Sequence, residues 1–227
     1  MSTTHIDYLH IEFNAPIQVF EVPAFRGAVI EKAGKEHLAF HNHFNDEKLS
    51  YGYPVIQYKR IHGNASIICL DYGASEFHHF FNNKSWDIHI GERPVKLPIK
   101  HMLLKQIELK VRQGSFKYNI QNWLAFSQEN YQKFQSIGDS AQELEFLKQI
   151  LIGNIISFAK GMKWQIDQEV IINIQEITNR KLLKYKKQTM LGLDLQFETN
   201  VFLPNYIGLG KAVSHGYGIV HYINTNQ

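Results

Sequence analysis

A glycine-rich stretch near the C-terminus, NVFLPNYIGLGKAVSHGYGIV at residues 200–220, constrains the fold more than any other segment. It follows a strand-like run (191–197), leads into another (218–223), and carries Gly208, Gly210, Gly216 and Gly218. The spacing is neither G-x-G-x-x-G nor G-x4-G-K-[ST], and no helical pattern follows it, which argues against a dinucleotide fold or a P-loop. Two interpretations stay open. The stretch is an ordinary connection between two strands, or it is a turn whose exposed amides and Lys211 hold phosphates, because glycine lets another backbone come close.

The first half of the chain alternates in a way that predicts strands around two helices. Residues 5–13 place Leu9, Ile11 and Phe13 on one side, which is typical of a half-buried strand. Pro23 then opens a helix that ends at Gly34. Further along we expect two strands (53–61 and 65–71) joined by a short turn at 62–64, a short helix (73–81), a hairpin turning at 91–94, and a long strand through Ile107, Leu109 and Val111.

The second half repeats this order without repeating the sequence. Gly114 is expected to open a series that begins with a strand at 116–126. A helix follows at 140–158, with apolar residues at intervals of three and four, and Gly161 ends it. Strands at 170–177, 188–197 and 216–223 complete the series, with the glycine-rich stretch in place of a second helix. We therefore predict an α+β protein of two tandem ferredoxin-like (RRM-like) β-α-β-β-α-β modules with antiparallel sheets, covering residues 1–113 and 114–227.

Composition narrows the class of protein. The content of 44% hydrophobic and 20% charged residues is that of a soluble globular protein. No apolar run reaches the ~20 residues needed to span a bilayer, and the first residues, MSTTHIDYLH, lack the pattern of a secretory signal. The one cysteine, Cys69, lies in the apolar run SIICL and is expected in the core. These features predict a cytoplasmic protein without a membrane partner.

The net charge of +3 does not by itself indicate a nucleic-acid-binding protein, but its distribution is more informative. Residues 180–187, RKLLKYKK, hold five cations and no acid, a run that attracts a polyanion. The same run is also compatible with a solvated hairpin tip.

Several segments in order resemble one known family. The glycine-rich stretch is similar to the loop that closes the RAMP superfamily of CRISPR-associated RNA-binding proteins, above all the repeat-processing endoribonucleases of the Cas-six family. The segments FRGAVIEK (25–32), FHNH (40–43), YPVIQYKRI (53–61), ILIGNIISFAKG (150–161) and MLGLDLQFETNVFLP (190–204) resemble the same family in both halves of the chain.

The resemblance implies cleavage of CRISPR repeat RNA without a metal or other cofactor. The ribose 2′-OH attacks the adjacent phosphorus and leaves a 2′,3′-cyclic phosphate and a 5′-OH. This reaction needs a base, an acid and a group that stabilises the phosphorane. Histidine suits proton transfer because its ordinary pKa is ~6.5. The family's catalytic histidine lies in the loop that here contains His37, His41 and His43, and the resemblance favours His41 as general acid or base, with His43 second and Tyr51 as a partner.

The resemblance also implies an RNA-binding surface. Lys211 and the amides of the glycine-rich stretch would contact phosphates, and the basic run would hold the RNA backbone, with Tyr185 either stacked on a base or packed under the hairpin. The candidate RNA-binding residues are Lys184, Lys186, Lys187, Gly208, Gly210, Lys211, His215, Gly216 and Gly218.

Other readings remain open. The adjacent His78 and His79 are expected to be exposed, and one cysteine without a paired histidine motif gives no reason to expect a zinc site. The chain can also be a non-catalytic RNA-binding subunit of a CRISPR effector complex, or a ferredoxin-like module for a small ligand or a protein. Other effector subunits are candidate partners, and monomer and homodimer both stay open.

Overall fold

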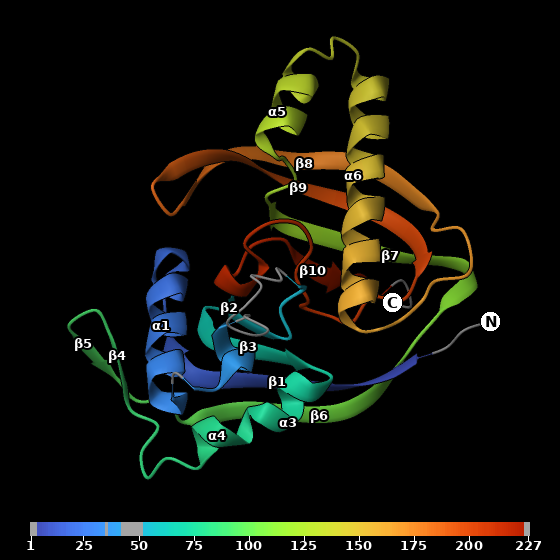
Figure 1. The fold of residues 1–227 in the computed structure, drawn as a ribbon. Coiled ribbons are helices and arrows are strands. Elements are labelled where there is room, and N and C mark those ends of the chain that lie inside the picture. Colours follow the sequence, from blue (N-terminus) through green and yellow to red (C-terminus); the bar gives the residue numbers. More distant parts are fainter. Residues whose placement is uncertain (1–3, 35, 42–51, 225–227) are drawn as a thin grey trace. The chain divides into compact units, whose positions relative to one another are not determined.

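The chain is an α+β protein with two four-stranded antiparallel sheets and a further two-stranded hairpin (Figure 1). The structure is a computed structural model that describes residues 4–34, 36–41 and 52–224. Two compact units are present. The N-terminal unit is His5–Glu108 together with Ser214–Gly216, and the C-terminal unit is Leu109–Val213 together with Thr4 and the chain from Tyr217 onward. No helix in the described part of the chain is long and apolar enough to cross a membrane.

The sheet of the N-terminal unit has the strand order β2-β3-β1-β6, with helices between β1 and β2 and between β3 and β6. This arrangement is consistent with the predicted ferredoxin-like module. The predicted helix at 73–81 is interrupted at Phe77 and forms two short helices. The elements are β1 (Thr4–Pro16), η1 (Val19–Glu21), α1 (Val22–Ala33), α2 (Leu38–His41), β2 (Ile56–Ile61), β3 (Asn64–Leu70), α3 (Tyr72–Glu76), α4 (His78–Phe81), β4 (Ile88–Ile90), β5 (Arg93–Val95) and β6 (Ile99–Leu109).

An aromatic cluster joins the first sheet to its helices. The ring of Phe25 on α1 lies edge-on to Phe13 of β1 and Tyr58 of β2, with centroids 6.4 and 5.9 Å apart. Phe80 of α4 packs edge-on against the same Phe13 at 6.4 Å. All four side chains are fully buried. Aromatic rings prefer such edge-to-face contacts, so this cluster fixes how α1 and α4 lie on the sheet.

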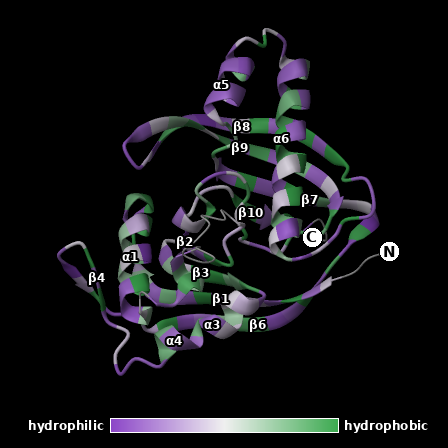
Figure 2. Cartoon of the chain, in the orientation of Figure 1, coloured by the Kyte–Doolittle hydropathy of each residue, from purple (hydrophilic) through white to green (hydrophobic). Residues whose placement is uncertain are grey.

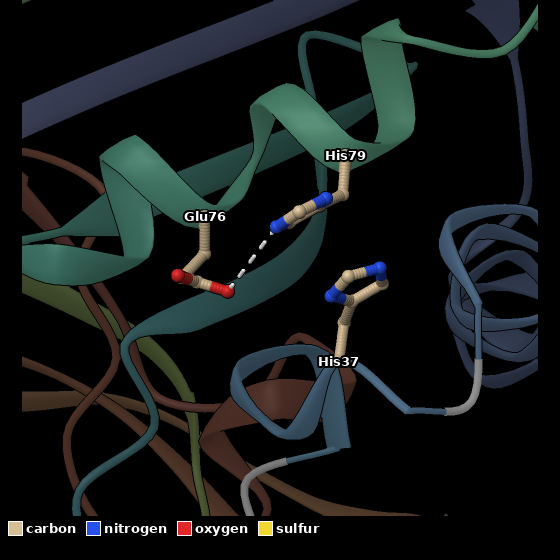
Figure 3. Close-up of side chains that lie close together, drawn as sticks. All are labelled: His37, Glu76 and His79. Atoms are coloured by element: carbon tan, nitrogen blue, oxygen red, sulfur yellow. Dashed lines mark ion pairs between the residues drawn. The ribbon is translucent and has the colours of Figure 1, made fainter.

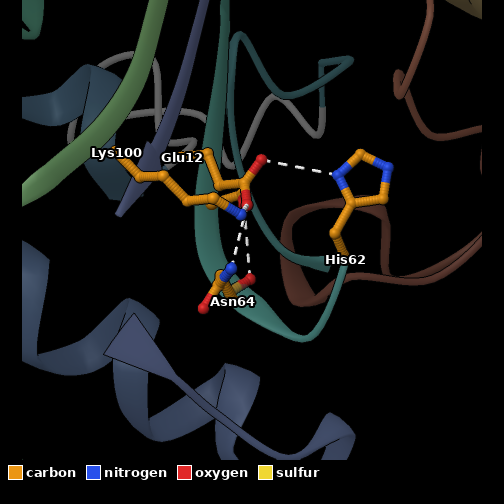
Figure 4. A network of polar contacts seen from close by, with 5 residues as sticks. Glu12, His62, Asn64 and Lys100 are labelled. Atoms are coloured by element: carbon orange, nitrogen blue, oxygen red, sulfur yellow. Dashed lines mark hydrogen bonds and ion pairs between the residues drawn. The ribbon is translucent and has the colours of Figure 1, made fainter. Parts of the chain in front are cut away.

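Glu12, a buried charge on β1, is held by a polar network (Figure 4). Lys100 Nζ lies 2.7 Å from Glu12 Oε1, and Asn64 Nδ2 donates to the same oxygen at 2.9 Å. His62 Nδ1 lies 3.4 Å from Glu12 Oε2. Burial by itself would raise the pKa of the Glu12 carboxyl, but these partners outweigh it and lower the pKa to about 2. Glu12 is therefore ionised and satisfied in the folded protein.

Lys59, a second buried charged residue, has no such network. It lies on β2 in the same cross-strand row as Glu12, because Ser66 of β3 pairs with Glu12 on one side and Lys59 on the other. Its side chain is fully buried, and its Nζ makes no hydrogen bond among the described residues. Burial lowers the pKa of the Lys59 ammonium to about 7. An unpaired buried cation costs stability, so the fold keeps this lysine at an energetic disadvantage.

The C-terminal unit has the strand order β10-β7-β9-β8, with helices between β7 and β8. Helix α6 contributes Leu147, Leu151, Ile155 and Phe158 to the core, as its periodicity predicts. Figure 2 shows hydrophobic and hydrophilic residues interspersed along this helix. The elements are β7 (Val111–Trp123), α5 (Gln128–Gln135), α6 (Ser140–Gly161), β8 (Ile172–Tyr185), β9 (Gln188–Val201), η2 (Val213–His215) and β10 (Ile219–Tyr222).

Three details of this unit differ from the prediction. Gly114 does not precede the first strand but lies inside β7, with φ 125° at a shift of register, so it accommodates a bulge. The short helix α5 was not expected because its sequence, QENYQKFQ, has few apolar residues; the Ser127 side chain caps it by accepting from Asn130 N at 3.0 Å. The basic run 180–187 was expected at the tip of a hairpin, but its residues up to Tyr185 are part of strand β8, where Tyr185 pairs with Gln188 of β9.

Replacing Lys59 by methionine is expected to stabilise the protein by about 1–4 kcal/mol at pH 7, because a buried charge is exchanged for apolar atoms of similar size. The wild type should gain stability as pH rises from about 7 toward the ordinary lysine value of 10.5. In that interval the unfolded chain binds the proton that the folded chain has released. Urea unfolding between pH 7 and 10 measures both effects.

The exposed Lys84→Met variant is the control and should leave the pH dependence of the wild type in place. A Lys59→Met protein that is less stable than the wild type at pH 7 would contradict the assignment of Lys59 as an unpaired buried cation.

Candidate functional site

His41 ends helix α2 and is half-buried. Arg26 Nη2 on α1 donates to the His41 carbonyl oxygen at 3.1 Å. The Tyr58 hydroxyl on β2 donates to the neighbouring Phe40 carbonyl at 3.4 Å. The last carbonyls of a helix have no partner within it, so side chains from two other elements satisfy them here. The candidate catalytic histidine is therefore held by α1 and β2.

Arg26 and Tyr58 also contact each other. The guanidinium carbon of Arg26 lies 5.9 Å from the centroid of the Tyr58 ring, which is a cation–π arrangement. Burial raises the pKa of the Tyr58 hydroxyl well above its ordinary value. The hydroxyl therefore stays protonated and acts as a hydrogen-bond donor that positions α2. Arg26 brings a positive charge beside His41. The sequence did not identify Arg26 as a site residue; the one indication was its place in the segment FRGAVIEK, directly after the core residue Phe25.

The other two predicted catalytic residues, His43 and Tyr51, lie outside the described residues. His37 lies just before α2 and stacks on His79 of α4, with ring centroids 3.6 Å apart. His78 is exposed as expected, but His79 is not: its side chain is 29% exposed, because the His37 ring covers it. The histidines near α2 thus separate into His41, bound to α1 and β2, and His37, in contact with α4.

In the glycine-rich segment, here residues 203–218, the glycines allow close packing against other parts of the same unit. A Cβ on Gly218 would lie 1.9 Å from the Leu209 carbonyl oxygen, and Gly218 has φ 63°. A Cβ on Gly210 would lie 2.7 Å from Trp123 Nε1. The amides of Leu209, Lys211 and Gly218 donate to carbonyls of Gly218, Leu124 and Asn122. Close packing against the protein itself accounts for two of the four glycines, and three amides of the segment are used internally.

The turn of this segment, Ser214–Gly216, belongs to the N-terminal unit. A Cβ on Gly216 would lie 3.1 Å from Val22 Cγ1 and 3.3 Å from the Tyr58 carbonyl oxygen. His215 is half-buried, and its Nδ1 lies 3.2 Å from Ser214 Oγ. The predicted RNA-binding residues His215 and Gly216 therefore share a unit with His41. Gly216 approaches the backbone of Tyr58, which also holds α2.

Lys211 is exposed and lines a cavity of about 550 Å³ in the C-terminal unit. The cavity walls come from the start of α5 and from both strands of the β8–β9 hairpin, which the sequence could not place beside Lys211. The lining residues from these elements include Gln128, Tyr131, Leu182, Gln188 and Met190. The signal for α5 was the Ser127 cap before Gln-Glu-Asn. Lys211 thus lies near the turn end of the basic hairpin.

The basic hairpin carries five cations, of which two are neutralised by ion pairs. Arg180 forms an ion pair with Glu143 of α6 at 2.5 Å, and Lys181 pairs with Asp194 of β9 at 2.6 Å. The three remaining lysines at the end of the hairpin are exposed and have no ion pair among the described residues: Lys184, Lys186 and Lys187.

An aromatic contact holds this end of the hairpin. The Tyr217 hydroxyl donates to the Lys184 carbonyl at 2.5 Å, and its ring packs edge-on against Tyr185 with centroids 5.8 Å apart. Tyr185 therefore packs against Tyr217. The contact ties the lysines to the glycine-rich segment.

Two protein families match the chain in succession. The Cas6b N-terminal domain matches residues 4–108, and the Cas6b C-terminal domain matches residues 110–223. A crystal structure of Cas6b is 25% identical, with a TM-score of 0.83 over 97% of this chain and 100% of that one. A second crystal structure, of the CRISPR RNA processing endoribonuclease Cas6b, is 24% identical with a TM-score of 0.73 over 97% and 100% of the two chains, and supports the fold. An uncharacterized protein of Methanocaldococcus jannaschii is 31% identical over 114 residues, which are 50% of this chain and 76% of that protein.

Replacing Gly218 by alanine is expected to destabilise the protein by more than about 2 kcal/mol, because the new methyl group overlaps the Leu209 carbonyl and a positive φ disfavours alanine. The control is Gly153→Ala in α6, where a Cβ meets no atom within 4 Å. That change should be neutral or stabilising by up to about 1 kcal/mol, since alanine favours helix. Thermal unfolding of both variants checks the pair; equal effects would contradict the packing role of Gly218.

Proposed function

The chain belongs to the Cas6b family, and from this premise we propose that it binds CRISPR repeat RNA and cleaves it without a metal ion. The observation that supports the proposal most is the family match over both units, combined with a histidine fixed at the end of α2 in the N-terminal unit. The alternative, a non-catalytic RNA-binding subunit, has no need of a histidine held in this way.

The proposed reaction is an internal transfer at one phosphodiester. The 2′-OH loses a proton to a base and its oxygen forms a bond to phosphorus. The bond from phosphorus to the 5′ oxygen breaks, and an acid supplies the proton that makes the 5′-OH. The products are a 2′,3′-cyclic phosphate and a 5′-OH end, and proton transfer of this kind contributes ~10²–10⁴-fold to a rate.

His41 is the proposed proton-transfer residue, with His43 and Tyr51 as further members of the set. The hydrogen bonds from Arg26 and Tyr58 to the end of α2 support this assignment, since a catalytic side chain has to be held in place by rigid neighbours. Arg26 and Tyr58 bond to the backbone and are positioning residues.

The proposed RNA-binding surface consists of two parts. In the C-terminal unit, Lys211 and the hairpin lysines Lys184, Lys186 and Lys187 contact phosphates. In the glycine-rich segment, His215 is a further candidate contact, and Gly208, Gly210, Gly216 and Gly218 shape the backbone that carries Lys211 and His215. The exposure of all four lysines supports their proposed role, because phosphate binding needs accessible cations.

Purified protein incubated with CRISPR repeat RNA in EDTA is expected to make one cut, which a single 2′-deoxy substitution at the cleaved position abolishes. His41→Ala should lower the cleavage rate by at least about 10²-fold, because it removes the proton-transfer group. Its affinity for the RNA should stay within two- to threefold of the wild type (~0.6 kcal/mol or less). Single-turnover kinetics and filter binding measure the two quantities.

The control is His89→Ala, an exposed histidine of β4 in the same unit, which should cleave at the wild-type rate. Cleavage by His41→Ala at the wild-type rate would show that another residue transfers the proton. Tight binding without any cut by the wild type would favour the non-catalytic alternative.

Lys211→Ala is expected to weaken RNA binding at low salt and to reduce the slope of log K against log[salt] by about 0.7–1, since one phosphate contact is lost. Lys133→Ala is the control, because Lys133 on α5 is exposed but already paired with Glu129 at 2.7 Å. Binding titrations from about 50 to about 300 mM salt, roughly threefold below to twofold above the physiological ionic strength of about 0.15 M, distinguish the two variants. An unchanged slope in Lys211→Ala would argue against a phosphate contact at this lysine.

A further inference from the structure

Three side chains from two segments that are far apart in the sequence converge in the N-terminal unit. They are His37, just before α2, Glu76, the last residue of α3, and His79 of α4. One ligand atom from each lies within 4.8 Å of the other two. In Figure 3 both histidine rings turn a nitrogen toward the side on which the Glu76 carboxylate lies. All three residues are half-buried, so the cluster is shielded and still open to a small ion from solvent.

The donor set is one that transition metals favour. Imidazole nitrogen and carboxylate oxygen bind Zn²⁺ at about 2.0–2.2 Å, and two histidines with one glutamate leave a fourth position for water. The His79 Nε2 to Glu76 Oε2 distance is 3.8 Å, and the two residues are three apart. Two donors about 2.0–2.1 Å from a tetrahedral ion lie about 3.4 Å apart, so this pair has to approach by only about 0.4 Å to share one ion.

Because the His37 and His79 rings are stacked, metal binding requires one rearrangement of these two side chains. The His37 and His79 rings are nearly parallel, with an interplanar angle of 21° and centroids 3.6 Å apart. A shared metal lies in the plane of each ring, so the rings have to rotate apart about their side-chain torsions. A second carboxylate, Glu36, lies 3.7 Å from His37 Nε2, where it can orient that ring. Carboxylates that hold a ligating imidazole in this way are a regular feature of metal sites.

We propose that His37, Glu76 and His79 form a binding site for one divalent transition-metal ion of the Zn²⁺ class. The ion joins the residue that precedes α2 to α3 and α4, and α2 ends on His41. The site is structural: it adds a third anchor to the short helix that Arg26 and Tyr58 already hold, and it contributes nothing to the bond-breaking step. The sequence did not indicate it, because its ligands come from two segments and only Glu76 and His79 share a motif.

The test is a calorimetric titration of Zn²⁺ into the untagged, EDTA-treated and desalted full chain, without RNA. We expect one saturable equivalent and a rise in Tm of about 5 °C when free Zn²⁺ is 100-fold above its Kd. His37→Ala and His79→Ala should each lose that equivalent and the Tm shift, and Glu76→Gln should weaken binding at least 10-fold. His89→Ala is the matched control and should bind as the wild type does.

The metal-free melting temperature of each variant shows whether it folds, and Glu76→Gln, which keeps the shape of the side chain, serves if an alanine variant does not. No saturable binding by the wild type would overturn the proposal. One equivalent that persists in both histidine variants would do so as well, because the ion would then be bound elsewhere among the other histidines.

This inference is separable from the proposed reaction. The titration uses no RNA, so it gives its answer whether or not the chain cleaves. Conversely, cleavage in EDTA tests the reaction with the metal removed. A chain that binds Zn²⁺ at these residues and fails to cut would retain the metal site and lose the catalytic proposal.

Discussion

Tyr58 is the residue on which the arrangement of the N-terminal unit depends. Its ring packs edge-on against Phe25 of α1 and under the Arg26 guanidinium. Its hydroxyl holds the end of α2, and its carbonyl lies beside Gly216. One strand residue therefore sets the positions of a core helix, the candidate catalytic helix and the turn of the glycine-rich segment. A buried tyrosine can do this because its ring supplies apolar contacts while its hydroxyl must find a partner.

The glycines near the C-terminus serve packing first. Gly210 and Gly218 allow Trp123 and the Leu209 carbonyl to approach more closely than any Cβ permits. Trp123 in turn donates to Asn154 of α6 at 2.9 Å, so the segment is tied to the main helix of the C-terminal unit. The segment is thereby a rigid support that presents Lys211 at its surface. Its sequence is also compatible with a phosphate-holding turn because the same property of glycine, close approach of another group, serves both purposes.

The face of the first sheet that carries Glu12 and Lys59 shows that the unit tolerates buried charge in two ways. Glu12 is stabilised by three partners, so its charge is compatible with burial. Lys59 has no partner among the described residues, and its ammonium loses affinity for its proton instead. Groups with such perturbed pKa values are frequent at functional sites, though ion-pair networks in purely structural positions produce them too. Glu12, Ser66 and Lys59 lie in one cross-strand row because of the strand pairing, and this row cannot be predicted from the sequence alone.

The local pattern of apolar residues, prolines and glycines in the sequence determined several strands and helices. Alternation predicted β1, the short turn at 62–64 predicted the hairpin of β2 and β3, intervals of three and four predicted α6, and Pro23 with Gly34 predicted the limits of α1. Motif resemblance identified the family, because several segments occur in the same order. Local pattern did not predict two features. Helix α5 has few apolar residues and depends on the Ser127 cap, and Gly114 accommodates a bulge inside β7 where the pattern suggested the start of a strand. Only the tertiary structure decided which side chains meet, since contacts between residues far apart in the chain are set by how the sheets and helices pack. It brought Arg26 and Tyr58 to the end of α2, Lys211 to the turn end of the basic hairpin, and His37 to Glu76 and His79.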